Sequence, residues 1–320
     1  MEPKQYYIGI DVGGTSVKEG LFDEDGNLLA KASVPTPPIV DAAGFAAVTE
    51  AIDQVVAKAQ IPRAFVAGIG LAVPCPIPAS GDAKVKANIA INLPELKIAI
   101  QEHCPDAVVK YENDANAAAM GEMTYGVARG MKNFIMITLG TGVGSGIVVD
   151  GNVVYGSDGF AGELGHVIVD RSEKARPCGC GRKGCLETYC SATGVARTAR
   201  EFLANSPMPS LLRDLDPATI TSYNVFQAAE AGDELAKQIF DFTGRILGEA
   251  CANFAAFNTP EAFVFFGGLT KAGNYLMEPL RKAYDENILN IFKGKAKLLI
   301  SSLNGSEAAV LGASALGWDA

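Results

Sequence analysis

The sequence predicts an α/β protein made of two related halves with a cleft between them. Short apolar runs alternate with segments whose apolar residues have helical spacing, as expected when strands alternate with helices. A strand–turn–strand unit near the N-terminus is repeated in the middle of the chain, with a glycine-rich turn at the same place in each copy. Order, spacing and turns repeat together, which favours duplication over a chance similarity between two hairpins.

The first copy of the repeated unit lies at the N-terminus. Tyr6–Asp11, Val17–Phe22 and Leu28–Val34 are predicted as three strands. The first two are joined by the turn Val12-Gly13-Gly14-Thr15, and the last two by Asp25-Gly26-Asn27. Turns rich in glycine and asparagine at this spacing are typical of antiparallel hairpins.

A helix and two further strands complete this half. Asp41 precedes a segment with apolar residues at helical spacing, so it is the expected N-cap. Val66–Val73 is a continuous apolar run, which predicts a strand covered on both faces. Val108–Tyr111 is predicted as another short strand, and an alanine-rich helix follows from Ala115 to about Tyr125.

The second copy repeats the order of the first. Phe134–Thr138 and Gly146–Val149 are the predicted strands, with Leu139-Gly140-Thr141-Gly142 between them and Asp150-Gly151-Asn152 after them. The remaining chain is predicted to be mostly helical, with two strands and a Gly-Gly turn. Its predicted elements are the helices Thr193–Leu203, Glu234–Phe257 and Glu307–Leu316, the strands Ala262–Phe266 and Lys297–Leu303, and a helix after Gly267-Gly268.

Composition excludes several classes of function. The 320 residues carry 27 basic and 36 acidic side chains, a formal net charge of −9, and 48% are hydrophobic. An acidic chain repels phosphate backbones, so we expect no general nucleic-acid binding. No apolar run approaches the ~18 residues of a membrane span, and the N-terminus lacks a signal-peptide pattern. We expect a cytoplasmic protein whose seven cysteines stay reduced, so that metal binding is favoured over disulfides.

The two glycine turns predict a phosphate-binding cleft. Backbone N–H groups that are free of side chains can hold phosphate oxygens, and an aspartate at a strand end is a suitable ligand for the Mg²⁺ of a nucleotide. Either turn alone could simply close a hairpin, but two related turns in facing halves favour a phosphate clamp. The predicted nucleotide-contacting residues are Asp11, Gly13, Gly14, Thr15, Lys18, Thr138, Gly140, Thr141, Gly142, Gly267 and Gly268. For the last two, a plain strand-to-helix turn is an equally good interpretation.

Four motifs together resemble the ROK family, which comprises sugar kinases and sugar-responsive repressors. They are Ile8–Thr15, Glu112–Ala118, Leu139–Gly142 and Gly162–His166, in this order along the chain. The resemblance implies the actin/hexokinase-like ATPase fold, with two ribonuclease-H-like domains, ATP in the cleft and γ-phosphoryl transfer to a hexose hydroxyl. It also implies a homodimer.

The resemblance divides the chain into two domains. A small N-terminal α/β domain would comprise residues 1–113, completed by a C-terminal helix within 305–320. A large α/β domain with a zinc-binding insertion would comprise residues 114–304.

A cysteine-rich segment predicts a structural zinc site. Cys178, Cys180 and Cys185 can place three thiolates around one ion, and His166 would complete a closed tetrahedral set. The alternative is a loop that merely contains reduced cysteines, but the family pattern independently places zinc on the same four residues. The other four cysteines (Cys75, Cys104, Cys190 and Cys251) have no comparable pattern.

Asp114 is the predicted general base. Phosphoryl transfer requires a carboxylate that accepts the proton of the attacking hydroxyl. An aspartate at a helix start is more often an N-cap, but the surrounding Glu112–Asn116 motif favours the catalytic role. The resemblance assigns hexose contacts to Asn92, Asn113, Asp114, Glu163, His166 and Glu187. If one nitrogen of His166 binds zinc, the other can donate to a sugar oxygen, so the metal would brace the sugar pocket.

The preferred hexose is less firmly predicted. Cys75 stands where the family usually has glycine, and Glu95-Leu96 stand where relatives often have tryptophan, both in the expected sugar pocket. The run Gly184–Gly194 resembles the glucokinase branch of the family, which favours phosphorylation of the 6-hydroxyl of glucose. The alternatives are N-acetylglucosamine, mannose or fructose as substrate, or a non-catalytic sugar-responsive regulator. Only seven residues precede Ile8, which argues against a DNA-binding repressor.

Overall fold

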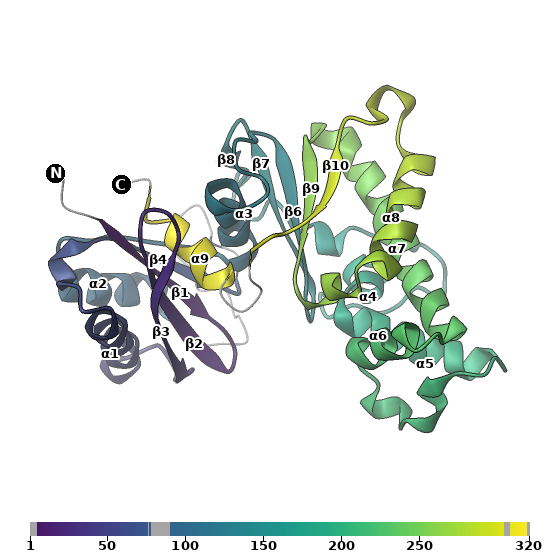
Figure 1. The fold of residues 1–320 in the computed structure, drawn as a ribbon, viewed down its shortest axis with the longest axis horizontal. Helices are drawn as coiled ribbons and strands as arrows, with labels where there is room; N and C mark the ends of the chain where they lie inside the picture. The colour runs from purple at the N-terminus through teal and green to yellow at the C-terminus, as the bar shows by residue number, and fades with distance from the viewer. Residues whose placement is uncertain (1–4, 76, 78–89, 304–307, 319–320) are drawn as a thin grey trace.

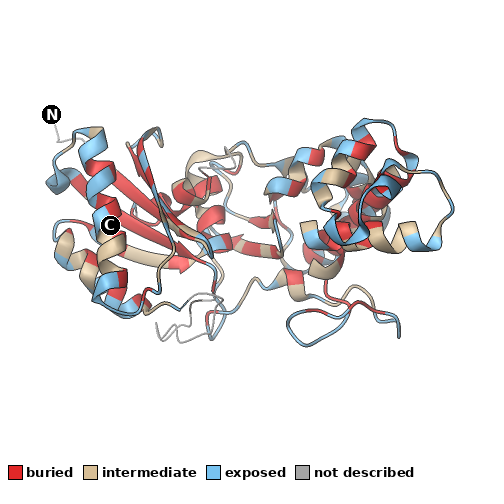
Figure 2. Ribbon diagram, turned by 90° about the horizontal axis from the view of Figure 1, so that it is seen from below, coloured by how far each residue is buried: buried red, intermediate tan, exposed pale blue. Residues whose placement is uncertain are grey.

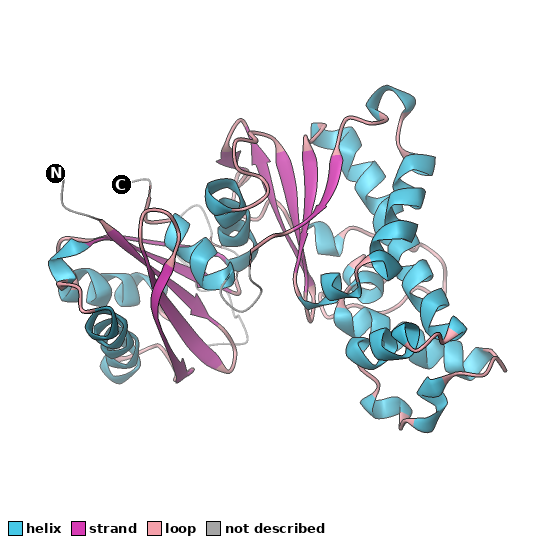
Figure 3. Cartoon of the chain, in the orientation of Figure 1, coloured by secondary structure: helices cyan, strands magenta, loops and turns pink. Residues whose placement is uncertain are grey.

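The computed structural model describes residues 5–75, 77, 90–303 and 308–318. Two five-stranded mixed sheets form the centre of the molecule, one in each half (Figures 1 and 3). Their strand orders are β3-β2-β1-β4-β5 and β10-β9-β6-β7-β8. The second order is the first written in reverse with each strand advanced by five, so both sheets have the same topology. The predicted α/β class and the duplication are confirmed.

The N-terminal sheet contains an antiparallel meander followed by parallel strands. Strands β1 (Tyr6–Val12), β2 (Ser16–Phe22) and β3 (Leu28–Pro35) pair antiparallel, and β4 (Val66–Val73) and β5 (Val108–Asn113) are added in parallel. Every predicted strand of this half is present. Connections that return a parallel strand to the sheet cross one of its faces, and helices occupy these crossovers.

Helices cover both faces of this sheet. Helix α1 (Ala42–Ala59) is capped by the Asp41 side chain, which accepts from Gly44 N, as expected. Helix α2 (Leu93–His103) packs beside it, and together they enclose the apolar core of this half. On the opposite face lies α9 (Ala308–Ala315), which contacts β1, β2 and β4. It lies so close that a Cβ on Gly9 would be 1.7 Å from Val310 O, and this position therefore requires glycine.

The second sheet repeats this plan in the C-terminal half. Strands β6 (Phe134–Leu139), β7 (Val143–Val149) and β8 (Asn152–Val153) form the antiparallel meander, and β9 (Ala262–Phe266) and β10 (Lys297–Ile300) are parallel to β6 and β9. Strand β10 is shorter than the predicted Lys297–Leu303. Its last expected residues leave the sheet as the chain crosses back toward α9, whose predicted first residue, Glu307, lies outside the described residues.

Helix α3 (Asp114–Tyr125) lies between the two sheets. It contacts β6 and β7 of the second sheet and packs on α9, which covers the first sheet (Figure 1). The chain passes between the halves at the β5–α3 junction and again between β10 and α9. The start of α3 is therefore fixed with respect to both halves.

The far end of the C-terminal half is helical (Figure 3). It contains α4 (Glu187–Cys190), α5 (Ala192–Asn205), α6 (Ser222–Glu230), α7 (Glu234–Asn258) and α8 (Asn274–Asn287). Apolar side chains of these helices and of the sheet form the largest buried core. In Figure 2 the strands are mostly buried, and the helices expose their outer faces. Short 3₁₀ turns occur at Arg63–Phe65, Leu164–His166, Leu211–Asp214, Pro217–Thr219, Gly268–Ala272 and Asn290–Phe292.

The predicted helices at Thr193–Leu203 and Glu234–Phe257 are confirmed by α5 and α7. The sequence analysis missed α2 and α6, which are 11 and 9 residues long. Among the described helices, none combines the length and apolar composition required to cross a membrane.

One buried carboxyl group lies in the N-terminal core without a hydrogen-bond partner. Glu19 is 1% exposed, and neither carboxyl oxygen has a partner among the described residues. It lies on the same face of β2 as Val17 and Leu21, since alternate residues of a strand share a face. Burial, with repulsion from Asp53, raises its pKa well above the usual 4.5. Folded protein therefore keeps Glu19 protonated at pH values where the unfolded chain ionises it.

We predict that Glu19→Leu stabilises the protein, by about 1–3 kcal/mol at pH 8. The folded state binds the extra proton above pH 4.5, so the wild-type free energy of unfolding falls as pH rises from there toward the raised pKa. Urea unfolding at pH 5 and pH 8 measures this. Glu19→Gln is the control, because it removes the pH-dependent part and retains a buried polar group. Equal pH dependence in wild type and Glu19→Leu would contradict the prediction.

Candidate active site and metal centre

A cavity of about 860 Å³ lies between the two halves, as the sequence predicts. The carboxyl ends of β1, β4, β5, β6 and β9 or the residues that follow them contribute to its walls, as is usual for ligand sites of α/β proteins. The second glycine turn and the segment from Phe160 to Glu187 complete it. The lining residues on which the argument rests are Asp11, Cys75, Asn113, Asp114, Thr138, Gly140, Thr141, Gly142, Glu163, His166, Cys180, Arg182, Glu187 and Gly267.

Asp114 is the first residue of α3, but the N-cap is Asn113. The Oδ1 of Asn113 accepts from Ala115 N at 2.9 Å and from Asn116 N at 3.3 Å. Asp114 Oδ1 also accepts from Ala115 N, at 2.8 Å, and its side chain lines the cavity. Since Asn113 supplies the cap, the carboxyl group of Asp114 faces the cleft.

The environment of Asp114 makes its carboxyl group a better proton acceptor. Burial, reinforced by the charges of Asp11 and Glu163, raises its pKa to about 6, although the Ala115 N–H opposes the shift. Asp11 lines the same cavity. Burial raises the pKa of its carboxyl group, and the positive charge of Lys18 partly offsets this rise. Three carboxyl groups thus line the cavity in one region.

Asn113 connects this helix start to the loop after β4. Its Nδ2 donates to Cys75 O at 3.3 Å, while its Oδ1 is occupied by the helix cap. Cys75 is 2% exposed and lines the cavity beside Asp114, whose charge adds to burial in raising the pKa of the thiol. The residue that stands in place of the usual glycine therefore narrows the cavity next to the predicted base.

The two glycine turns are placed differently with respect to this cavity. Gly140, Thr141, Gly142 and Thr138 line it. Gly13, Gly14 and Thr15 form the β1–β2 turn, outside the described lining. Lys18 lines a separate groove of about 340 Å³ on the N-terminal sheet, with Lys31 and Lys58.

Asn92 is also outside the described lining of the cavity. It caps α2, where its Oδ1 accepts from Glu95 N at 3.5 Å. The predicted hexose contact of Asn92 and the phosphate contacts of the first glycine turn stay predictions.

Gly267 and Gly268 lie at the boundary of two cavities. Gly267 lines the main cleft with φ at +112°, a conformation that favours glycine, and Gly268 lines a neighbouring cavity of about 390 Å³. Gly140 and Thr141 line both cavities. The second cavity also includes Ser222, Tyr223, Phe226 and Lys271, which the sequence analysis missed. These residues belong to α6 and the turn after β9, and a helix predicted over residues 222–230 would have drawn attention to them.

Glu163, His166 and Glu187 lie together on the other side of the cleft. His166 Nε2 is 3.8 Å from Glu163 Oε2. Glu187 Oε2 accepts from Val143 N at 3.0 Å, and a Cβ on Gly142 would be 2.3 Å from that same oxygen. The carboxyl group of Glu187 therefore rests on the second glycine turn. It links the predicted hexose side of the cavity to the predicted phosphate side.

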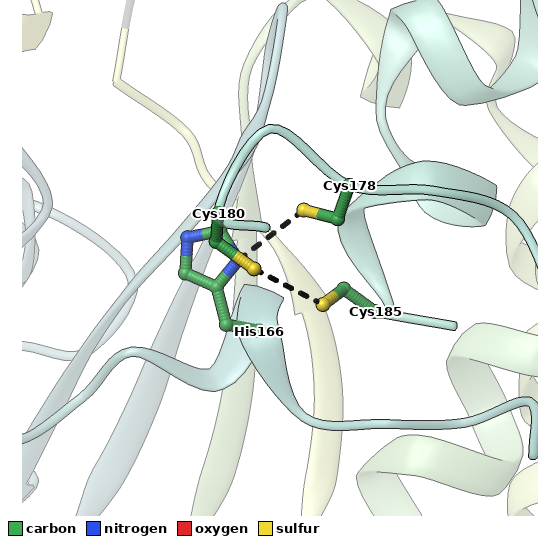
Figure 4. A group of neighbouring side chains, drawn as sticks. All are labelled: His166, Cys178, Cys180 and Cys185. Atoms are coloured by element: carbon green, nitrogen blue, oxygen red, sulfur yellow. Dashed lines mark hydrogen bonds between the residues drawn. The ribbon is translucent and has the colours of Figure 1, made fainter. Parts of the chain in front are cut away.

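His166, Cys178, Cys180 and Cys185 form one cluster, in which the potential ligand atoms all lie within 4.8 Å of one another (Figure 4). Cys178 Sγ is 3.7 Å from His166 Nδ1, and Cys180 Sγ is 3.6 Å from Cys185 Sγ. A tetrahedron with metal–sulfur bonds of about 2.3 Å has edges of about 3.8 Å, so both separations fit one shared ion. All four residues lie where the sequence predicted a metal site.

Arg182, which lies in the cysteine loop, places a positive charge next to the thiol of Cys180. The backbone N–H and the guanidinium group of Arg182 lower the pKa of Cys180 to about 6. Arg182 also donates to His166 O at 2.7 Å, so it ties two of the four residues of the cluster together. A thiol that ionises readily is suited to metal binding.

Arg176 anchors the base of this loop instead of facing the thiols. It is 4% exposed, and its guanidinium group pairs with Glu201, donates to Thr188 O at 2.8 Å and lies 4.4 Å from the ring centroid of Tyr189. Its Nη2 also donates to Thr198 Oγ1 at 2.9 Å. A buried guanidinium group with this many partners fixes the loop onto α4 and α5.

Comparison of this structure with solved structures identifies the class of fold. The structure resembles the crystal structure of a ROK family glucokinase from Streptomyces griseus in complex with glucose and AMPPNP, with a TM-score of 0.78 and 31% identity over 98% of this chain and 100% of that chain. The class is therefore the actin/hexokinase-like α/β fold, with duplicated domains around a cleft.

Sequence comparisons then identify the family. The family model described as "ROK family" matches residues 7–319. A glucokinase from Halalkalibacterium halodurans is 37% identical over 98% of this chain and 94% of that protein. A glucokinase from Streptomyces coelicolor is 33% identical over 97% and 96%. This chain belongs to the ROK family.

We predict that Arg176→Met lowers the free energy of unfolding by about 3 kcal/mol, because it removes a buried guanidinium group and leaves Thr188 O and Thr198 Oγ1 without this donor. Arg197→Met is the matched control. Arg197 binds the same Glu201, through Nε at 2.9 Å, but is 36% exposed, so its loss should cost less than about 1 kcal/mol. Urea unfolding of both variants measures the difference. Equal losses of unfolding free energy in the two variants would show that the buried contacts of Arg176 do not stabilise the protein more than the exposed contact of Arg197.

Proposed function

We propose that this protein is an ATP-dependent hexose kinase that phosphorylates the 6-hydroxyl of glucose. The observation that carries the proposal is the position of Asp114, a buried carboxyl group with a raised pKa, in a cleft that also holds Asp11 and the second glycine turn. The similarity to two glucokinases over nearly the full chain supports the same activity.

Asp114 would act as the general base. Its carboxylate accepts the proton of the 6-hydroxyl as the new oxygen–phosphorus bond forms and the bond between the β–γ bridging oxygen and the γ-phosphorus breaks, with ADP as leaving group. A carboxyl group with a pKa of about 6 is ionised at neutral pH and still accepts a proton more readily than an ordinary aspartate. The neighbouring charges of Asp11 and Glu163 favour the protonated product of this step.

The nucleotide would extend from the second glycine turn into the neighbouring cavity. Gly140 N donates to Gly142 O within the turn, so the backbone N–H groups of Thr141 and Gly142 would face the phosphates. The adenosine moiety would fit the 390 Å³ cavity between Gly268 and α6, where Tyr223 and Phe226 offer aromatic surface. Asp11 is the carboxylate best placed to hold Mg²⁺, which neutralises the charge of the phosphates when bound.

The hexose would lie between Asp114 and the segment that carries Glu163, His166 and Glu187. Carboxylates accept hydrogen bonds from adjacent hydroxyls of a polyol, and an imidazole N–H can donate to a sugar oxygen. Asn113 has one amide N–H beyond the bond to Cys75 O, and it can donate to the sugar. Cys75 narrows this region, which disfavours hexoses with a bulky substituent near the base.

We propose that the histidine–cysteine cluster binds structural Zn²⁺. Three thiols and one imidazole are the preferred ligands of zinc, and four protein ligands leave no position open for water. His166 would bind through Nδ1, the nitrogen nearer to Cys178, which leaves its Nε2 for the hexose. The metal when bound supplies rigidity, and the residues of this chain carry out the chemistry.

We further propose that the protein acts in the cytoplasm, in carbohydrate metabolism, and as a homodimer. The similarity to a glucokinase over nearly the full chain supports the location and the metabolic role, and the resemblance to the family supports the dimer. Light scattering of the purified protein tests the oligomeric state.

We predict that the wild type consumes ATP with glucose faster than with mannose, fructose, N-acetylglucosamine or allose, and yields glucose 6-phosphate. Asp114→Asn should lower kcat by about 10²–10⁴-fold and leave glucose binding within about threefold, since the amide is isosteric but cannot accept the proton. For the wild type, kcat/KM should fall below about pH 6, where Asp114 becomes protonated.

A coupled assay for ATP consumption and calorimetry of glucose binding measure these values. Full turnover in Asp114→Asn would exclude Asp114 as the base. Glucose binding by the wild type without turnover on any hexose would instead favour a sugar-responsive regulator.

We predict that Cys180→Ser reduces zinc from about one equivalent per chain to a small fraction and raises the dissociation constant for glucose about tenfold, because His166 loses its brace. Elemental analysis and calorimetry measure the two effects. Cys104→Ala, which removes a buried thiol from the N-terminal core, is the control and should retain zinc. Full zinc content in Cys180→Ser would refute the assignment.

A further inference from the structure

A buried carboxylate lies directly beneath the predicted base. Glu112, the penultimate residue of β5, is 5% exposed, and both of its carboxyl oxygens accept hydrogen bonds. Oε1 accepts from Asn113 N at 2.7 Å and from Asn116 Nδ2 at 3.1 Å. Oε2 accepts from the hydroxyl group of Tyr155 at 2.7 Å. One carboxylate therefore joins three groups.

The two oxygens of Glu112 hold different parts of the molecule. Oε1 holds the first turn of α3, because Asn113 is its cap and Asn116 lies in it. Oε2 holds a residue of the other half, since Tyr155 follows β8 of the second sheet. The Glu112–Tyr155 hydrogen bond thus connects the strand that leads to Asp114 with the C-terminal half.

Tyr155 begins the segment that carries a predicted hexose ligand. Residues 155–163 lead from β8 to Glu163, and Phe160, Gly162 and Glu163 line the cleft. The segment closes on itself where Ala161 N donates to Tyr155 O at 3.1 Å. Its far end is held by Ser145, whose hydroxyl donates to Gly162 O and accepts from Leu164 N at 3.1 Å. Its near end is held by Glu112.

The hydrogen bond between Tyr155 and Glu112 is of a strong kind. It joins a phenolic hydroxyl to a carboxylate, and Glu112 is 5% exposed while Tyr155 is 43% exposed. A carboxylate that loses one of its donors in such a place is left partly unsatisfied, so the contact resists separation. Because this hydrogen bond joins the two halves, breaking it can change the distance between Asp114 and Glu163.

We propose that Glu112 and Tyr155 are positioning residues, which set the hexose-binding segment 155–163 at the correct distance from Asp114. This proposal rests on the proposed function, in which the hexose lies between Asp114 and Glu163. Neither residue touches the hexose. Each acts through the segment that it holds, so its loss affects hexose binding more than nucleotide binding.

Tyr155→Phe tests the proposal, because it removes only the hydroxyl group. We expect KM and the directly measured dissociation constant for glucose to rise about fivefold to tenfold, with KM for ATP within twofold and the melting temperature within about 2 °C. Tyr7→Phe is the matched control. The Tyr7 hydroxyl donates to Gln5 Oε1 at 3.1 Å, at the start of β1, and its loss should leave both KM values unchanged.

A second variant shows whether the two residues act together. Glu112→Gln alone should raise the glucose KM, because the charge of the acceptor is lost. In Tyr155→Phe/Glu112→Gln the two effects should combine to less than their product, since both remove the same hydrogen bond. Independent effects that multiply in full would overturn the pairing.

Amide hydrogen exchange provides a readout that does not depend on catalysis. Tyr155→Phe should speed exchange in residues 155–163 and in the first turn of α3, and Tyr7→Phe should do neither. If exchange is faster in Tyr155→Phe but the wild type phosphorylates no hexose, the proposed function is refuted, while the structural link between Glu112 and Tyr155 stands. Unchanged exchange in both segments, an unchanged glucose KM, or an equal rise of both KM values with a large loss of melting temperature would each overturn the proposal.

Discussion

The side chain of Asn113 caps α3, and the geometry of the cleft depends on this contact. A helix start leaves backbone N–H groups without partners, and an aspartate at this point would normally accept from them. Asn113 Oδ1 accepts from Ala115 N and Asn116 N. Asp114 therefore contributes only Oδ1, which also accepts from Ala115 N, and its side chain lines the cavity. Asn113 also reaches Cys75 O, and its own N–H is held by Glu112. Asn113, which precedes the predicted base Asp114, is therefore held by contacts to Glu112, to Cys75 O and to the first turn of α3.

Glu187 connects the second glycine turn with the histidine–cysteine cluster. Its Oε2 accepts from Val143 N in the turn, and its Oε1 lies 3.9 Å from Cys178 Sγ of the cluster. Arg176 holds the start of the same cysteine loop in a buried network. If the cluster binds a metal as proposed, its order can reach the second glycine turn through these short contacts.

Local patterns in the sequence were sufficient to predict the two sheets, most of the helices and the clustering of His166 with three cysteines. The glycine turns, the continuous run Val66–Val73 and the spacing of Cys178, Cys180 and Cys185 are each visible within a few residues. Helices α2 and α6 were missed because 11 and 9 residues are few over which to recognise a helical period, and Tyr223 and Phe226 were missed with α6.

Contacts between distant segments could not be predicted from local patterns. Tyr155 has no distinguishing neighbours in the sequence, and its partner Glu112 becomes evident only when the two halves are placed together. The burial of Glu19 without a hydrogen-bond partner is likewise a property of the packed core. Lys18 illustrates the same difficulty, because it pairs across the strands with Asp11 and its charge acts on that carboxyl group, yet it lines a groove outside the described cleft lining.

The central claim is that Asp114 lies between the hexose and the nucleotide as the base. A crystal structure of the protein with glucose and a non-hydrolysable ATP analogue tests it most directly. The account predicts an Asp114 carboxyl oxygen within about 2.6–3.2 Å of the glucose 6-hydroxyl, with that hydroxyl in line with the γ-phosphorus. Glucose bound with its 6-hydroxyl away from Asp114, or a different carboxylate at that distance, would contradict it.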